Sequence, residues 1–153
     1  MARFKFRLQK ILELRKRKQE DRQKELAGLK KLLKEEEKLL EKLKKQGYEV
    51  RKKIDLIQSK KENSLDMEEL TRHSDYLDSL RNRILSQIRT IRKVIEDIEN
   101  KRGELIDASK EKKIIETLKE QQYKKFRESL ENWEKKRLDE FGMINYSHRR
   151  DNK

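Results

Sequence analysis

Between Ser59 and Asp66 the sequence reads Ser-Lys-Lys-Glu-Asn-Ser-Leu-Asp, and only here does helical patterning stop between residues 3 and 141. Asn63 and Ser64 favour turns because their side chains bond the neighbouring backbone. Asp66 can cap a new helix, and Glu69, three residues later, completes a reciprocal cap. We therefore expect a helix at about residues 3–58, a turn at about 59–66 and a helix at about 67–141. If the chain reverses at the turn, position i of the first helix faces roughly position 125 − i of the second.

The composition is typical of a coiled coil. The chain has 153 residues, no proline and four glycines, and 48% of its residues are charged. Its 32% hydrophobic residues are few for the core of a compact domain but suffice for a narrow seam between two helices. Disorder is the competing interpretation, but Leu and Ile recur with helical spacing. The sequence therefore predicts an all-α fold, a long antiparallel two-helix coiled-coil hairpin that forms a single domain.

Apolar residues recur at spacings of three and four on both arms. The first arm carries Leu26, Leu29, Leu32, Leu33, Leu39, Leu40, Leu43, Val50, Ile54 and Ile57, and the second carries Leu70, Leu77, Leu80, Ile84, Ile88, Ile91, Val94 or Ile95, Ile98 and Leu105. Glu36 and Gln46 are polar seam positions that can fix the register. The seam is also polar from Arg15 to Arg22, and the pairing rule places this stretch opposite the weakly patterned residues 103–110. The weakly apolar stretches of the two arms would thus face each other. This favours a hairpin in which the arms pair with each other over a chain in which each arm binds another partner.

The second arm is longer than the first. Once the first arm is exhausted near residue 3, the residues after Gln122 have no partner within the chain. They carry an aromatic-rich stripe, and an exposed stripe of this kind usually marks an interface. Its residues are Phe126, Leu130, Trp133, Leu138 and Phe141. Residues 142–153 lose the pattern, so we expect them to form a mobile basic tail.

The formal net charge is +13, from 43 Lys and Arg against 30 Asp and Glu. Such a charge favours an acidic protein, nucleic acid or an anionic membrane surface as partner. For nucleic acid the signal is weak, because the basic run of residues 15–18 has no base-reading Asn and Arg spacing and no aromatic platform. A membrane-surface helix could use Phe4, Phe6 and Leu8, but these residues have a ready partner in the second arm. No run of about twenty apolar residues exists, so no membrane span is expected.

The sequence offers no grouping for catalysis. It has no cysteine and only two histidines, His73 and His148, and it lacks a glycine-rich phosphate loop or a nucleophile motif. His73 lies near the seam of the second arm, which favours a structural role. We therefore expect no enzyme activity, no cofactor and no metal. Tyr48 and Tyr76 face each other by the pairing rule, which leaves open either an exposed aromatic pair or packing along the hairpin.

Both ends of the chain resemble those of one family. Residues 4–15 read Phe-Lys-Phe-Arg-Leu-Gln-Lys-Ile-Leu-Glu-Leu-Arg, which resembles the opening signature of the FliJ family of bacterial flagellar export proteins. Residues 138–141 read Leu-Asp-Glu-Phe, which resembles the Met/Leu-Asp-Glu closing motif of the same family. The length and the turn position also agree.

The resemblance implies a component of the flagellar type III export apparatus, cytoplasmic and peripheral at the inner face of the cell membrane. Its implied role is that of a stalk-like connector, whose open end binds the hexameric export ATPase and promotes its assembly and activity. Another surface contacts the cytoplasmic linker of the large export-gate membrane protein, and the family is also described as an escort for export chaperones. An injectisome stalk homologue or a generic coiled-coil scaffold would share the fold but lack both end motifs.

The resemblance also assigns candidate contact residues by position. The ATPase-facing set is Phe4, Phe6, Leu8, Gln9, Ile11, Arg15, Leu138, Asp139, Glu140 and Phe141. Trp133 joins this set because it lies on the unpaired end of the second arm. The gate-facing set is Leu43, Tyr76 and Leu80, and Tyr48 joins it through its expected pairing with Tyr76.

Overall fold

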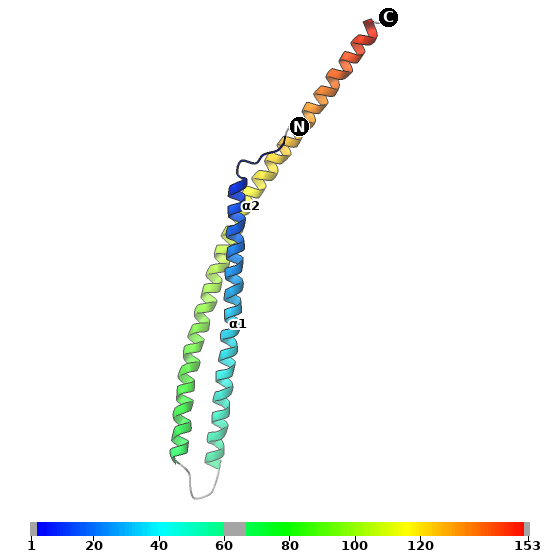
Figure 1. Cartoon of the computed structure of the whole chain (residues 1–153). Coiled ribbons are helices and arrows are strands. Elements are labelled where there is room, and N and C mark those ends of the chain that lie inside the picture. The colour runs from blue at the N-terminus through cyan, green and yellow to red at the C-terminus, as the bar shows by residue number, and fades with distance from the viewer. Residues whose placement is uncertain (1–2, 60–66, 152–153) are drawn as a thin grey trace. The chain divides into compact units, whose positions relative to one another are not determined.

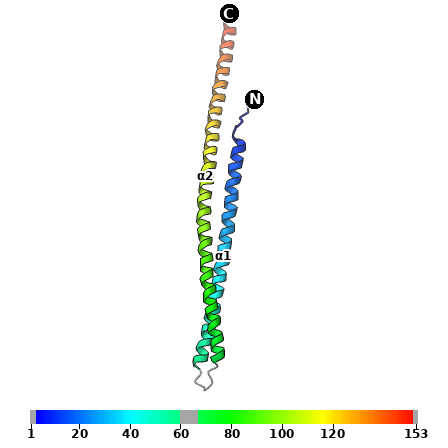
Figure 2. The ribbon, with the colours of Figure 1, turned by 90° about the vertical axis from the view of Figure 1, so that its left-hand side faces the viewer.

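The structure is a computed structural model that describes residues 3–59 and 67–151. Two α-helices, α1 (Gln9–Ser59) and α2 (Met67–Asp151), run side by side in opposite directions (Figures 1 and 2). The predicted antiparallel helical hairpin is therefore confirmed. The chain groups into two compact units, which are described separately: unit 1 holds Met1–Glu20 and Asp107–Lys153, and unit 2 holds Asp21–Ile106.

The core of unit 2 is a seam between the two helices. One buried cluster contains Leu43, Val50, Leu77 and Leu80, with Ile54 and Ile84 packed against it. The other contains Leu26, Val94 and Ile98, with Leu29, Leu33 and Leu105 packed against it. Their spacing of three and four keeps these residues on the facing sides of both helices. Leu32 and Leu39, which the sequence also places in the pattern, are instead exposed, and of Val94 and Ile95 it is Val94 that is buried.

A buried polar contact interrupts the apolar seam between Leu33 and Leu43 in unit 2. Gln87 is buried, and its side-chain amide donates to the backbone carbonyl of Glu36 at 3.0 Å and to the Glu36 carboxylate. A buried polar residue in a seam loses its partner when one helix slips along the other, so it selects one register. Glu36 thus lies at a polar position of the seam, as the sequence predicts.

The observed register agrees with the pairing rule to within a helical turn. The pairing rule implies that the numbers of two facing residues add up to about 125. In unit 2 the sum is 123 for Glu36 with Gln87 and 126 for Arg22 with Glu104. In unit 1 they add up to 128 for Gln19 with Ser109, whose side chains are hydrogen-bonded at 3.0 Å. The polar part of α1 therefore faces the weakly patterned part of α2, as the sequence predicts.

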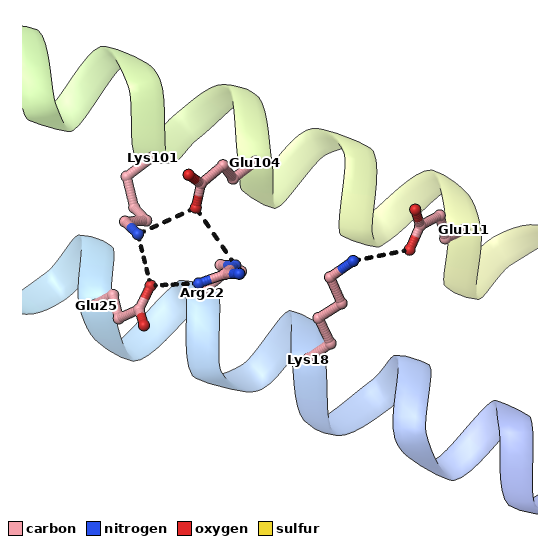
Figure 3. A network of polar contacts seen from close by, with 6 residues as sticks. All are labelled: Lys18, Arg22, Glu25, Lys101, Glu104 and Glu111. Atoms are coloured by element: carbon pink, nitrogen blue, oxygen red, sulfur yellow. Dashed lines mark hydrogen bonds and ion pairs between the residues drawn. The ribbon is translucent and has the colours of Figure 1, made fainter.

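An alternating ring of charges replaces apolar packing in unit 2 (Figure 3). Glu25 lies 3.0 Å from Arg22 and 2.8 Å from Lys101, while Glu104 lies 3.4 Å from Arg22 and 3.0 Å from Lys101. The hydrogen bond from Lys101, followed by that from Arg22, lowers the pKa of Glu25. The hydrogen bond between Lys101 and Glu25 raises the pKa of Lys101. The hydrogen bond between Arg22 and Glu25 likewise raises the pKa of Arg22.

Both outer helix ends differ from the expected ones. Residues 3–6 are not helical and α1 begins at Gln9, later than the expected residue 3. None of the residues 3–8 is a favoured N-cap, and the Phe4 ring packs on Tyr123 and Phe126 of α2. α2 continues to Asp151 instead of ending near 141, because residues 142–151 contain no proline and place His148, Arg149 and Arg150 in the last turn, where the helix dipole favours cations.

The expected turn falls almost entirely on residues 60–66, which lie outside the described residues. The helices that flank it end at Ser59 and start again at Met67, with Glu68 and Glu69 in the first turn of α2. In the part of the chain that the structure describes, neither helix contains a segment that is long and apolar enough to cross a membrane.

Candidate functional site

The N-terminal segment of unit 1 packs its rings onto α2. Side chains alternate along it, with Arg3, Lys5 and Arg7 exposed and Phe4, Phe6 and Leu8 half-buried. This period of two is that of an extended chain, which also reaches about twice as far per residue as a helix. The segment therefore presents a row of cations outward and holds its apolar side chains against the helix.

Phe4 makes the main aromatic contacts of this segment. Its ring centroid lies 5.3 Å from that of Tyr123, in an edge-on arrangement at 71°, and 5.6 Å from that of Phe126. Such pairs add about 1 kcal/mol beyond the area that they bury. Phe126 thus has a partner within the chain, whereas the sequence places it beyond the end of the first arm.

The other N-terminal candidates also contact α2 within unit 1. Lys119 donates to the side-chain oxygen of Gln9 at 2.9 Å and lies 6.0 Å from the ring centroid of Phe6. Arg15 and Lys18 both pair with Glu111, and Figure 3 shows the pair with Lys18. The hydrogen bond from Lys18 is the main cause that lowers the pKa of Glu111. Of this predicted set, only Ile11 is exposed, at 40%.

The C-terminal candidates lie on a part of α2 that no other segment of unit 1 covers. Every side chain from residue 131 to residue 150 is exposed, including Trp133, Leu138, Asp139, Glu140 and Phe141. This is the orange to red part of the ribbon in Figure 1. Large apolar side chains here remain in water at considerable cost, which is typical of a surface that another protein covers.

These apolar side chains form a shallow groove on one face of α2. The groove runs along a row of residues at spacings of three and four. We call this row the α2 stripe. The α2 stripe consists of Leu130, Trp133, Arg137 and Phe141, which line the groove, and of Ile144, which continues the same spacing beyond it. Phe126 bounds the groove at one end, and Ser129, Glu134 and Leu138 line its sides.

Arg137 is the stripe residue that the sequence analysis missed as a contact. Its guanidinium carbon lies 4.8 Å from the ring centroid of Trp133 and 5.8 Å from that of Phe141. The guanidinium therefore stacks between two aromatic side chains, one turn before and one turn after it. The sequence does carry a signal for this contact, because Trp133, Arg137 and Phe141 follow one another at intervals of four residues. Tyr123 was missed too, because its contact depends on the extended N-terminal segment.

The structure divides the gate-facing candidates. Leu43 and Leu80 are buried at 9% and 0% exposure in the core of unit 2, so they hold the two helices together and offer no surface to a partner. Tyr48 and Tyr76 are exposed at 59% and 44%. No ring contact between them is recorded in the described part of the chain, and the Tyr48 ring instead lies 4.7 Å from the ammonium group of Lys52.

His73 has a carboxylate neighbour on its own helix. His73 is half-buried, and its Nε2 lies 3.7 Å from the carboxylate of Glu69 one turn away. Across residues 3–59 and 67–151, no group of three His, Cys, Asp or Glu side chains could hold a metal ion.

The fold and these surfaces define a class, the two-helix coiled-coil proteins that carry exposed apolar and aromatic residues at one end of a helix. Within this class, the chain belongs to the FliJ family. The family model described as "Flagellar FliJ protein" matches residues 4–151, nearly the whole chain, which confirms the resemblance seen at both ends. Proteins of this family are components of flagellar type III export. No curated protein and no solved structure matches the chain.

Proposed function

We propose that this protein is the stalk-like connector of the flagellar export apparatus. It binds the hexameric export ATPase through unit 1, promotes the assembly and activity of the hexamer, and links it to the export gate. It has no catalytic activity and no cofactor of its own, and it acts on the cytoplasmic side, peripheral to the membrane through its partners.

The observation that carries this proposal is the exposed α2 stripe in a member of the FliJ family. Trp133 and Phe141 are 54% and 56% exposed on a helix that has no partner of its own at this point. Aromatic and Arg side chains are the commonest anchors of protein interfaces. Leu138, Asp139 and Glu140 lie among these anchors and belong to the same contact.

The N-terminal candidates take a supporting part. Phe4, Phe6, Leu8 and Gln9 pack on α2, and Arg15 pairs with Glu111. They therefore stiffen unit 1 beside the stripe, while Arg3, Lys5 and Arg7 add cations that an acidic partner surface attracts.

The mechanism is mechanical and allosteric. A rod that contacts the subunits of a ring unequally can bias them toward different states only through differential contacts. The α2 stripe lies on one face of its helix and is suited to such unequal contact. ATP hydrolysis itself belongs to the partner.

The link to the export gate uses Tyr48 and Tyr76, the two exposed members of the gate-facing set. Leu43 and Leu80 act on this surface only by fixing the helices that carry it. Escort of export chaperones belongs to the same proposal, but no particular residue supports it. Loss of gate-linker binding in Tyr48→Ala and Tyr76→Ala variants, with unfolding unchanged, tests the gate contact.

The decisive experiment is ATP hydrolysis by the purified cognate export ATPase with and without this protein. We expect stimulation by the wild type and loss of stimulation by Trp133→Ala/Phe141→Ala. The matched control is Leu85→Ala/Ile106→Ala, which removes apolar side chains of similar exposure, 55% and 54%, from unit 2. Absence of stimulation and of co-assembly by a helical wild-type protein would contradict the proposal. Steeply salt-dependent binding to any long polyanion would then favour nucleic acid.

A further inference from the structure

The α2 stripe is symmetric about Arg137. From Arg137, an aromatic residue lies four positions away on each side and an aliphatic residue seven positions away on each side, in the order Leu130, Trp133, Arg137, Phe141, Ile144. At 100° per residue these side chains fall within an arc of about 80° over a length of about 21 Å. Phe141 follows Leu130, and Ile144 follows Trp133, by eleven residues, a spacing that keeps a stripe nearly parallel to the helix axis. A partner would therefore meet a straight apolar strip with one cation at its centre.

Arg137 lies against two rings and forms no ion pair with another described residue. Other arginines of the chain pair with a carboxylate three or four residues away, as Arg127 does with Glu131 at 3.7 Å and Arg102 with Glu99 at 2.9 Å. Arg137 has Glu134 and Glu140 at such spacings, yet among the described residues no ion pair of Arg137 is recorded. It stacks on Trp133 and Phe141 instead. Stacking uses the faces of the guanidinium and leaves its N–H edges directed away from the rings as donors.

Covering the stripe creates a requirement for a negative charge. When a partner buries Trp133 and Phe141, it also removes water from Arg137 between them. A guanidinium that loses its water without an anionic acceptor is strongly destabilising, whereas a carboxylate can accept two of its N–H groups at once. The surface that covers this stripe must therefore carry a carboxylate at its centre.

A second copy of the chain does not meet this requirement. Two α2 stripes packed antiparallel would place Leu130 on Ile144 and Trp133 on Phe141 of the other copy, which suits apolar contact. The same pairing sets Arg137 against Arg137 and Glu134 against Glu140. Like charges in contact oppose association, so the stripe selects against its own copy.

We propose that Arg137 is the specificity-determining residue of the α2 stripe, and that the stripe binds an acidic protein surface in which one Asp or Glu side chain, set among apolar residues, faces the guanidinium. This inference rests on the proposed function, because it assigns that carboxylate to the export ATPase. Trp133 and Phe141 supply the buried apolar contact, and Arg137 decides which apolar surfaces are accepted.

The test is the dissociation constant of the full-length protein for the export ATPase, measured for single variants on the same helix. Arg137→Gln keeps a similar shape and removes the charge, so we expect binding to weaken at least about tenfold. Arg137→Lys keeps the charge but loses the planar fork and the stacking, so it should fall between the wild type and Arg137→Gln. Lys136→Gln is the matched control, because it removes the neighbouring charge from outside the stripe, and it should change binding less than about twofold.

Several outcomes would overturn the inference. If Arg137→Gln binds as Lys136→Gln does while Trp133→Ala/Phe141→Ala loses binding, the proposed function stands and the role of Arg137 fails. If the wild type does not bind the ATPase at all, both fail. Dimerisation of the wild type that Trp133→Ala abolishes would assign the stripe to a second copy. Binding to phosphatidylglycerol vesicles that Arg137→Gln abolishes would assign the cation to a lipid headgroup.

Discussion

Leu80 is the side chain that unit 2 buries most completely, at 0% exposure, beside Leu43, Val50 and Leu77. Replacing it with alanine removes apolar contacts on every side, and a leucine-to-alanine change of this kind costs about 3 kcal/mol. We expect Leu80→Ala to lower the midpoint of urea unfolding, followed by far-UV circular dichroism, without a change in the slope.

Leu85→Ala is the control for Leu80→Ala. Leu85 lies on the same helix but is 55% exposed, and alanine forms helix at least as well as leucine. Its midpoint should stay close to that of the wild type. Equal losses in both variants would show that Leu80 does not anchor the seam.

Gly47 is a buried helical glycine with space beside it. A methyl group added to its backbone would meet no heavy atom within 4 Å, and no glycine of the described residues has a positive φ. Alanine therefore gains helix propensity without a clash, and Gly47→Ala should stabilise the protein by about 1 kcal/mol. Thermal unfolding measures the gain, with the exposed Gly103→Ala as the comparison. A lower unfolding temperature for Gly47→Ala alone would show that the helices need the glycine to approach each other.

At the scale of the elements, ion pairs link α1 to α2 where the apolar seam is interrupted. The pKa values of Glu25 and Glu111 lie below their ordinary value because Lys101 and Lys18, respectively, donate hydrogen bonds to them. A carboxyl group with a lowered folded-state pKa stabilises the fold above its unfolded pKa, and this stabilisation is lost as the pH falls through the folded-state value. Lys101 behaves in the opposite sense: its pKa is raised, so its contribution is lost as the pH rises through that value.

We therefore expect the unfolding temperature to fall when the pH drops from neutral to below the ordinary carboxyl pKa of about 4.5. Glu25→Gln/Glu111→Gln should lower the unfolding temperature at neutral pH and make its further fall in acid smaller than in the wild type. Glu41→Gln is the control, because no ion pair of Glu41 is recorded in the described part of the chain. Identical acid profiles for the double variant and the wild type would contradict the role of these pairs. High salt should flatten the profile of the wild type, since these groups are exposed.

At the scale of the whole molecule, stability and partner binding depend on different residues. Side chains from residue 131 to residue 150 are exposed and contact no other segment of unit 1. A chain that ends at Leu130 should therefore unfold within about 3 °C of the full-length protein. It should also fail to stimulate the export ATPase. A much larger fall in the unfolding temperature would show that the end of α2 stabilises the hairpin.

Much of the fold and part of the candidate site could be predicted from the sequence. Apolar spacing predicts the seam residues Leu26 to Ile98, and the polar segment near Arg22 predicts the register, because both depend on which side chains face each other across two regular helices. Exposure of Trp133 and Phe141 follows from the unequal lengths of the two arms. The burial of Leu43 and Leu80 was also implied by their seam positions, although the family pattern assigned them to a partner.

The sequence by itself determined that two helices pair in opposite directions, which face of each is buried and where the polar contacts interrupt the seam. These features follow from local periodicity, which every residue of a regular helix obeys. Only the tertiary structure decided that residues 3–6 are extended, since the packing of Phe4 on Tyr123 and Phe126 competes with one more helical turn. It also decided that Arg137 stacks on Trp133 and Phe141. The long Arg137 side chain can reach both the nearby carboxylates and the two rings, and which of them it contacts depends on their positions in space, which the sequence alone does not give.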